Sequence, residues 1–289
     1  MDEPVRESFH DHGDLSARLS QHNFRTPAPE SCCDVVLRVD GVRFYAHRFL
    51  LAASSKPLRI MLTGSMREAK EMEVTIHDIK SYIMEQLLEF IYTGDVELST
   101  ETVVQTMTAA EVYELAALRD VCKHFALRHA KHVFKAQMIE VLPEKLLCDL
   151  VAHDDLAIRE ADLLDAVLAW AEARYDSVAE DVEDTTAHGA GIQLILQDVW
   201  PLIRFPTMSV RMLYGTVRPL VRDHFIPEYL LTEALFFHLN WGAAQSPDHQ
   251  KRMTPRTCSA ATRKRKRVSF IQTVSFDTPP ERGADEPLP

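Results

Sequence analysis

The sequence predicts an α+β domain, then an all-helical domain, then a tail without a packed core. Three observations support this. Residues 34–47 are rich in β-branched residues on both sides of an Asp40-Gly41 turn signal, which indicates a β-hairpin. From residue 81 to about residue 241, apolar residues recur three and four positions apart, which is the helical period. After residue 245 the chain is rich in Pro, Thr, Ser and charge, a composition that favours disorder.

The α+β domain is expected to open with two strands and a helix. Residues 34–39 and 42–47 carry the β-branched and aromatic side chains that fit a pleated sheet. An apolar helix is expected to start at Arg48. Further along, Met84, Leu87, Leu88 and Ile91 are spaced for one helix face, and Thr93-Gly94 predicts where that helix ends.

Charge and cysteine usage narrow the function classes. The 289-residue chain has a net charge of −11; nine Lys/Arg and four Asp/Glu from Lys251 onward give the tail +5, which leaves −16 on the body. Nucleic acid would repel such a body, so we do not expect it to read DNA. Five cysteines without regular spacing, two of them adjacent, indicate a reduced compartment. No run of about 18 apolar residues occurs, so no membrane span is expected.

Five sequence blocks identify the first domain. They are DVVL from residue 34, G-x-x-F-x-A-H-R from residue 41, LLAASS from residue 50, FIYTGDVEL from residue 90 and AAEVYELAALRDVC from residue 109. In this order they resemble a BTB (POZ) domain. The resemblance implies an interaction module that dimerises and that, in many members, recruits a cullin-type ubiquitin ligase scaffold.

The helical region resembles a BACK domain, the helical partner that follows many BTB domains. The matching pieces are L-x-x-L-V-x-x-D-x-L from residue 147, E-x-D-L-L-x-A-V-L-x-W from residue 160 and I-R-F-P-x-M-S from residue 203. Two features depart from the family. The stretch between residues 122 and 142 is shorter than the usual opening helix pair, which extends the cullin contact in family members. Residues 177–191 form an acidic, glycine-containing insertion that is expected to be a solvated loop.

These patterns predict four segments. They are a flexible N-terminus with a short dimerisation helix (1–29), a BTB domain (30–125), a BACK-like helical domain with an acidic loop at 177–191 (126–244), and a disordered basic tail (245–289). The tail is too short for a kelch-type β-propeller, which needs about four blades of 40–50 residues.

The resemblance also implies a dimer face. Asp34 and Arg48 match the positions of a charged pair in the family's dimer groove, although the same residues could serve as an ordinary surface or capping pair. An exposed ion pair contributes only about 0–1 kcal/mol. Most of the stability of the dimer is therefore expected from the apolar residues Leu15, Leu19, Leu50 and Leu51.

A cullin-binding loop is implied between the helix that ends near residue 63 and the next strand. Met66-Arg67-Glu68 matches the hydrophobic-x-Glu motif that family members use for cullin-3-type scaffolds. The apolar side chain would enter a pocket at the centre of the interface and the carboxylate would fix the orientation. Val112 and Tyr113 are expected to line the same groove. The alternatives are a solvated charged loop and ordinary core packing.

The tail carries two motifs. Arg263, Lys264, Arg265, Lys266 and Arg267 form an unbroken cationic run that resembles a nuclear import signal. Arg267-Val268-Ser269-Phe270 resembles the RVxF motif with which regulators dock on type-1 protein phosphatase, where Val268 and Phe270 would fill two apolar pockets beside an added strand. The alternatives are a solvated charge run and a chance match.

Enzyme chemistry is not expected. The sequence contains no serine-hydrolase, dinucleotide-binding, P-loop or zinc-protease motif, so it predicts no enzyme, no cofactor and no catalytic residue. His124, His129 and His132 lie near one another, but no metal-binding spacing accompanies them.

The leading functional hypothesis is a substrate adaptor of a cullin-3-type RING ubiquitin ligase that acts as a BTB-mediated homodimer in cytoplasm and nucleus. The alternative is a non-catalytic BTB scaffold, in the nucleus, that docks type-1 phosphatase through its tail. The sequence does not name the client protein.

Overall fold

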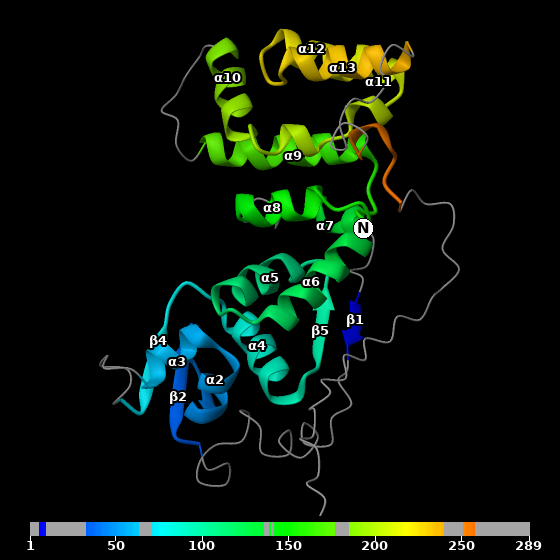
Figure 1. Ribbon diagram of the computed structural model, residues 1–289. Coiled ribbons are helices and arrows are strands. Elements are labelled where there is room, and N and C mark those ends of the chain that lie inside the picture. The colour runs from blue at the N-terminus through cyan, green and yellow to red at the C-terminus, as the bar shows by residue number, and fades with distance from the viewer. Residues whose placement is uncertain are drawn as a thin grey trace, which may run out of the picture. The chain divides into compact units, whose positions relative to one another are not determined.

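The computed structural model describes residues 6–9, 33–63, 71–135, 139, 142–176, 185–239 and 251–257 (Figure 1). All of them belong to one compact unit, residues 1–259. A small sheet with helices comes first and an all-helical region follows, as the sequence predicts. The expected N-terminal helix and the tail from residue 258 onward lie outside the described residues.

The β-hairpin confirms the prediction made from the Asp40-Gly41 signal. β2 (Val35–Val39) and β3 (Val42–Ala46) pair antiparallel, with Val39 opposite Val42. Asp40 and Gly41 have φ angles of 47° and 80°. Two consecutive positive φ angles are what a tight two-residue hairpin turn requires, and Asp and Gly adopt them at low cost. β4 (Glu73–Ile76) runs parallel to β2, so the sheet order is β3-β2-β4.

Five helices belong to the described residues of this part of the chain. They are α2 (Arg48–Ser54), α3 (Lys56–Thr63), α4 (Ser81–Thr93), α5 (Val103–Val112) and α6 (Ala116–Arg128). α4 ends as predicted, because Gly94 has a φ of 76° and its N–H donates to the Phe90 carbonyl at 2.8 Å. After it, β5 (Val96–Ser99) pairs antiparallel with β1 (Arg6–Phe9).

Two hydrophobic clusters share helix α4. Met84 and Leu88 pack in the cluster that surrounds the three-stranded sheet, while Ile83 and Leu87 pack in a second cluster that continues into the helical region. These pairs occupy adjacent faces, because residues four apart lie above one another on a helix. α4 is therefore the element through which the packing of the α+β region and of the helical region is joined.

The helical region consists of short elements around one long helix. They are α7 (Ala130–Val133), α8 (Glu144–Val151), α9 (Glu160–Asp176), α10 (Thr185–Ile195), the 3₁₀ turns η3 (Trp200–Leu202) and η4 (Phe205–Thr207), α11 (Val210–Met212), the π-turn η5 (Leu213–Val217), α12 (Arg218–Arg222) and α13 (Glu228–His238). Trp170 on α9 is fully buried, and its indole N–H donates to the Leu142 carbonyl at 2.9 Å.

The predicted acidic loop at 177–191 is corrected in its second half, because α10 begins at Thr185. The two glycines that favoured a loop have a packing role instead. A Cβ atom on Gly189 would lie 2.1 Å from the Asp223 carbonyl oxygen, and one on Gly191 would lie 2.3 Å from the Tyr175 ring. Glycine thus allows α10 to approach its neighbours closely, at the usual cost in helix propensity of about 1 kcal/mol per residue. Residues 177–184 lie outside the described part of the chain.

Within the described residues, no helix combines the length and the apolar character that a membrane crossing needs.

Candidate protein-binding surface

A buried serine fastens α3 to the end of α5. Ser55 is 1% exposed, and its hydroxyl donates to the Tyr113 carbonyl at 2.7 Å. The same oxygen accepts the N–H of Leu58 in the first turn of α3 at 3.2 Å. Ser55 and Tyr113 are 58 residues apart in the sequence. Their hydrogen bond therefore fixes the relative positions of two surfaces that are predicted to line one groove.

Val112 and Tyr113 lie side by side at the end of α5 but differ in exposure. The Val112 side chain is 63% exposed, whereas Tyr113 is half-buried and packs against both hydrophobic clusters. Burial, together with the nearby Asp78 carboxylate, raises the pKa of Tyr113, so its hydroxyl stays protonated. The Val112 side chain is thus available to a partner, while the Tyr113 side chain packs beneath the surface. Met66 and Glu68, the predicted centre of this site, lie outside the described residues.

Glu111 joins three helices beside this surface. Its two carboxylate oxygens accept from Arg119 on α6 at 3.1 Å and from Lys145 on α8 at 2.7 Å. Hydrogen bonds from Lys145 and Arg119 hold the pKa of Glu111 below its usual range. This site is not predicted from the sequence, since nothing in the spacing of residues 111 and 145 signals a contact between them.

Arg48 braces the two ends of the segment that carries Met66 and Glu68. Its guanidinium donates to the Leu62 carbonyl at 2.8 Å, at the end of α3, and to the Glu71 carbonyl ahead of β4. The Asp34 carboxylate accepts the backbone N–H of Arg48 at 2.7 Å, at the start of α2. The structure therefore gives Asp34 a capping contact and Arg48 a bracing contact; their predicted place in a dimer groove stays a prediction.

The prediction of an apolar dimer face is corrected at Leu51. Leu51 is fully buried among the residues around the sheet, so its side chain is not available to a second chain. Leu50 is partly buried against the same cluster. Two positions before Leu51, the large apolar side chain of Phe49 is 83% exposed. Leu15 and Leu19 lie outside the described residues.

His47, at the junction of β3 and α2, is hydrogen-bonded to Tyr92 on α4. The Tyr92 hydroxyl accepts the backbone N–H of His47 at 3.0 Å and lies 2.8 Å from the ring Nδ1 of the same residue. Burial raises the pKa of Tyr92 strongly, so its hydroxyl keeps its proton at neutral pH. The Cys33 sulfur lies 3.9 Å from Nε2, on the other side of the ring.

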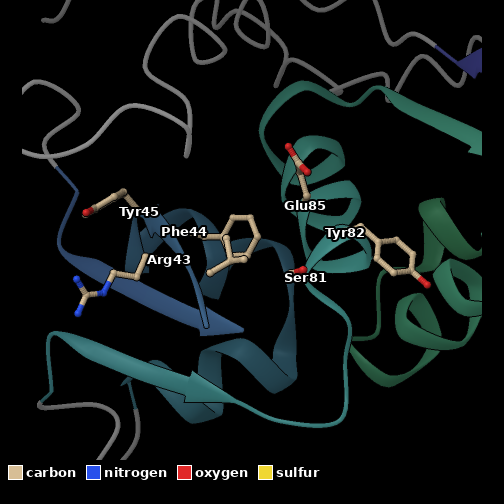
Figure 2. A pocket seen from close by; sticks show the side chains of 7 residues that line it. Arg43, Phe44, Tyr45, Ser81, Tyr82 and Glu85 are labelled. Atoms are coloured by element: carbon tan, nitrogen blue, oxygen red, sulfur yellow. The ribbon is translucent and has the colours of Figure 1, made fainter. Parts of the chain in front are cut away.

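A cavity of about 350 Å³ opens between the outer edge of β3 and the start of α4 (Figure 2). It is lined by Val42, Arg43, Phe44, Tyr45, Ser81, Tyr82 and Glu85. The described residues of the lining include no histidine, cysteine or lysine, and in Figure 2 the side chains of Arg43 and Tyr82 point away from each other. These residues do not form a nucleophile–base arrangement, so the cavity does not support a catalytic role. In the part of the chain that the structure describes, no His, Cys, Asp and Glu side chains gather into a metal-binding group.

The two tail motifs remain predictions. The basic run from Arg263 to Arg267 and the docking residues Val268 and Phe270 lie outside the described residues. The described part of the predicted tail, residues 251–257, is folded against the helical region instead.

Comparison with known families defines the class of protein. Residues 24–130 match the BTB/POZ domain, and residues 103–188 match the BACK domain, described as "BTB And C-terminal Kelch". The chain therefore carries a BTB/POZ domain followed by a BACK domain. The two matched regions overlap at residues 103–130, which include α5 and α6.

Among curated proteins, the chain is similar to Kelch-like protein 17 of Mus musculus and of Homo sapiens. Each is 29% identical over 242 residues, which cover 72% of this chain and 36% of the relative. The chain thus spans about a third of the length of these relatives. Among solved structures, it is similar to the BTB domain of zebrafish PATZ1, with 25% identity, a TM-score of 0.33, and coverage of 38% of this chain and 88% of that one. The BTB domain of human gigaxonin has 22% identity, a TM-score of 0.32, and coverage of 40% and 97%.

Proposed function

We propose that this protein is a substrate adaptor of a cullin-3-type RING ubiquitin ligase and acts as a BTB-mediated dimer. The sequence motif at Met66 and Glu68 would contact the scaffold, and the exposed Val112 would extend the contact. The BACK domain or the tail would bind the client protein.

One observation carries this proposal. Both ends of the segment that holds Met66 and Glu68 are fixed by Arg48, and the adjacent surface with the exposed Val112 is fixed by the bond from Ser55 to Tyr113. A frame of this kind limits the conformational freedom that a binding segment loses on association, which favours affinity. The order of a BTB domain and then a BACK domain supports the same role, because the resemblance implies cullin recruitment for many such proteins.

The test is a binding titration of the whole chain with the purified N-terminal domain of cullin-3. A double variant, Met66→Ala with Glu68→Ala, is expected to weaken binding by about 30-fold or more, since central interface residues contribute about 2 kcal/mol or more. Leu194→Ala is the matched control, because Leu194 is 67% exposed on α10 of the helical region and its loss should leave the affinity unchanged. No binding by the natural chain, or equal binding by the double variant, would refute the proposal.

The dimer part of the proposal needs its own measurement. We expect the Phe49 side chain, which is 83% exposed on α2, to lie in the interface between two chains. Phe49→Ser should therefore shift the mass measured by light scattering from two chains towards one. The control is the same change at Ile60, Ile60→Ser, because Ile60 is an exposed apolar residue on α3. A monomeric natural chain would remove the dimer from the proposal without affecting the cullin contact.

The second candidate function is a non-catalytic scaffold that docks type-1 protein phosphatase, and the RVSF sequence at residues 267–270 favours it. A peptide of this kind adds as a strand to a sheet edge and fills two apolar pockets. Val268→Ala with Phe270→Ala should abolish phosphatase capture and leave cullin binding intact. The adjacent cationic run predicts entry into the nucleus, which fluorescence microscopy of a chain lacking residues 263–267 would test.

A further inference from the structure

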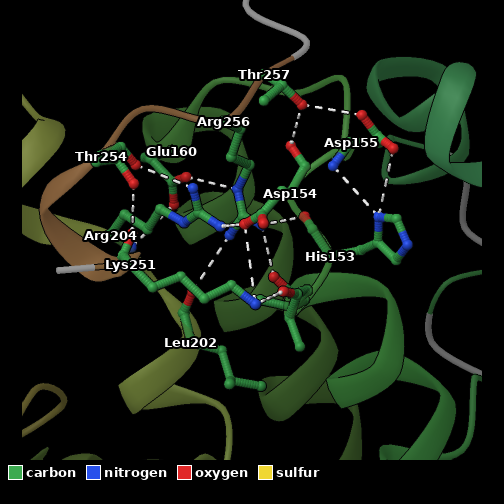
Figure 3. A network of polar contacts seen from close by, with 12 residues as sticks. His153, Asp154, Asp155, Glu160, Leu202, Arg204, Lys251, Thr254, Arg256 and Thr257 are labelled. Carbon is green, nitrogen blue, oxygen red and sulfur yellow. Dashed lines mark hydrogen bonds and ion pairs between the residues drawn. The ribbon is translucent and has the colours of Figure 1, made fainter. Parts of the chain in front are cut away.

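Residues 251–257 lie against the helical region, although their composition favours disorder (Figures 1 and 3). Arg256 in this segment is 5% exposed. Its guanidinium donates from Nε to the Glu160 carboxylate at 2.6 Å, from Nη1 to the Val151 and His153 carbonyls at 2.6 and 2.8 Å, and from Nη2 to the Leu202 carbonyl at 3.2 Å. The N–H groups of one guanidinium thus donate to all four acceptors.

The four acceptors belong to different elements. Val151 and His153 are at the end of α8, Glu160 begins α9, and Leu202 ends η3. Burial lowers the pKa of Arg256, while the Glu160 carboxylate acts in the opposite direction. Because a buried charge is tolerated only when it is paired and hydrogen-bonded, this arrangement suits an arginine. A lysine in its place would present one ammonium and could not reach all four acceptors in their planar arrangement.

The main chain around Arg256 is held as well. The Thr257 N–H donates to the Asp154 carbonyl at 3.0 Å, and the Thr254 carbonyl accepts from Arg204 at 2.9 Å. Arg204 is itself 3% exposed and pairs with the Asp154 carboxylate. The segment is therefore held by backbone contacts on both sides of one deeply inserted side chain.

We propose that the helical region contains an arginine-recognition site for a peptide segment, and that this chain fills the site with its own residues 251–257. Glu160 and the carbonyls of residues 151, 153 and 202 recognise the guanidinium, while Arg204 and Asp154 hold the peptide backbone. Occupation of the site anchors the chain immediately ahead of residue 258, so the segment with the predicted tail motifs starts from a fixed point on the domain. This inference does not depend on the proposed ligase function.

The first test is hydrogen–deuterium exchange of the full chain. Arg256→Gln and Arg256→Lys should each raise the exchange rate of the amides in residues 251–257 by at least about tenfold, since each removes charge-assisted hydrogen bonds. Arg222→Gln is the control, because Arg222 is exposed and pairs with its neighbour Asp223. Unchanged exchange at residues 251–257 in both Arg256 variants would overturn the proposal.

The second test supplies the peptide separately. A fluorescent peptide of residues 249–259 should bind the Arg256→Gln chain at least about tenfold more tightly than it binds the natural chain, whose site is filled. The same peptide with lysine at position 256 should bind neither. Equal binding of the arginine and lysine peptides would show that no guanidinium site exists. If Arg256→Gln fails to fold, as judged by exchange in α4, the comparison is made with Arg256→Lys, and the same outcomes decide.

Discussion

Arg48 in the BTB domain and Arg256 beyond the helical region perform the same task over different distances in the sequence. Each guanidinium donates to backbone carbonyls of other segments. The carbonyls that Arg48 reaches belong to residues 14 and 23 positions later, whereas Arg256 reaches residues 105 and 103 positions earlier. Hydrogen bonds to carbonyls that are close in sequence can form together with the neighbouring helices. Hydrogen bonds to carbonyls about a hundred residues away form only after the intervening domain has folded.

The same contrast separates the two regions as a whole. Around the sheet, the hairpin and α2 follow one another in the sequence and share one hydrophobic cluster. The helical region is closed by side chains that are distant in sequence and by helices that approach each other at glycines. Local patterns therefore predict the first region well, and the second depends on long-range packing.

The largest expected effect tests whether the two clusters are one cooperative unit. Trp170→Ala in the helical region should lower the free energy of unfolding by about 3–5 kcal/mol, and Leu37→Ala in the sheet cluster by about 2–5 kcal/mol, because both side chains are fully buried. Since α4 belongs to both clusters, each variant should shift a single denaturant transition seen by near- and far-ultraviolet circular dichroism. Two separate transitions would show that the regions unfold independently.

The next effect tests the close approach of α10. Gly191→Ala places a methyl group against the Tyr175 ring and should lower the free energy of unfolding by about 1–3 kcal/mol. Gly215→Ala is the matched control, since the added methyl group there meets no atom of the described residues within 4 Å, apart from its chain neighbours and its own helix backbone. That variant should be neutral or more stable by up to about 1 kcal/mol. The measurement is the melting temperature of each variant in thermal unfolding. Equal melting temperatures would contradict the packing role of Gly191.

An effect of similar size is expected at the contact between α3 and α5, beneath the proposed cullin surface. Ser55→Ala removes the donor to the Tyr113 carbonyl and the acceptor for the Leu58 N–H, both in a buried setting. The loss should be about 1–3 kcal/mol in a urea titration. Ser54→Ala is the neighbouring control, because Ser54 is exposed and bonds within its own helix. If both variants lose the same stability, the bond to Tyr113 is not what joins α3 to α5.

The smallest effect depends on pH. Because Lys145 and Arg119 lower the pKa of Glu111 in the folded state, Glu111 stabilises the fold at neutral pH, and this contribution disappears as the pH falls from about 4.5 through the lowered folded value. The side chains of Lys145 and Arg119 are 75% and 39% exposed, so the contribution should not exceed about 1 kcal/mol. Glu111→Gln should therefore be less stable than the natural chain at pH 7 and equal to it near pH 2. A constant difference across that range would contradict this assignment, and the exposed Glu101→Gln serves as the control.

The sequence by itself determined the order of the domains and the elements of the α+β region. The Asp40-Gly41 turn, the strands beside it and the Gly94 stop each follow from a local conformational preference, and residues close in sequence carry enough information to predict them. The family motifs added the expected contacts at Met66 and Glu68, which lie in a short segment that can be found without a structure.

Tertiary structure alone decided which side chains meet. Leu50 and Leu51 are adjacent residues of the same type, but Leu50 is partly buried and Leu51 is fully buried in the core. The glycines of α10 were interpreted as loop residues, because the sequence does not show the Tyr175 ring and the Asp223 carbonyl that pack against them. Arg256 was assigned to a disordered tail for the same reason. Its burial depends on four acceptors that come together only when α8, α9 and η3 have packed, and composition averaged over a window contains no information about such contacts.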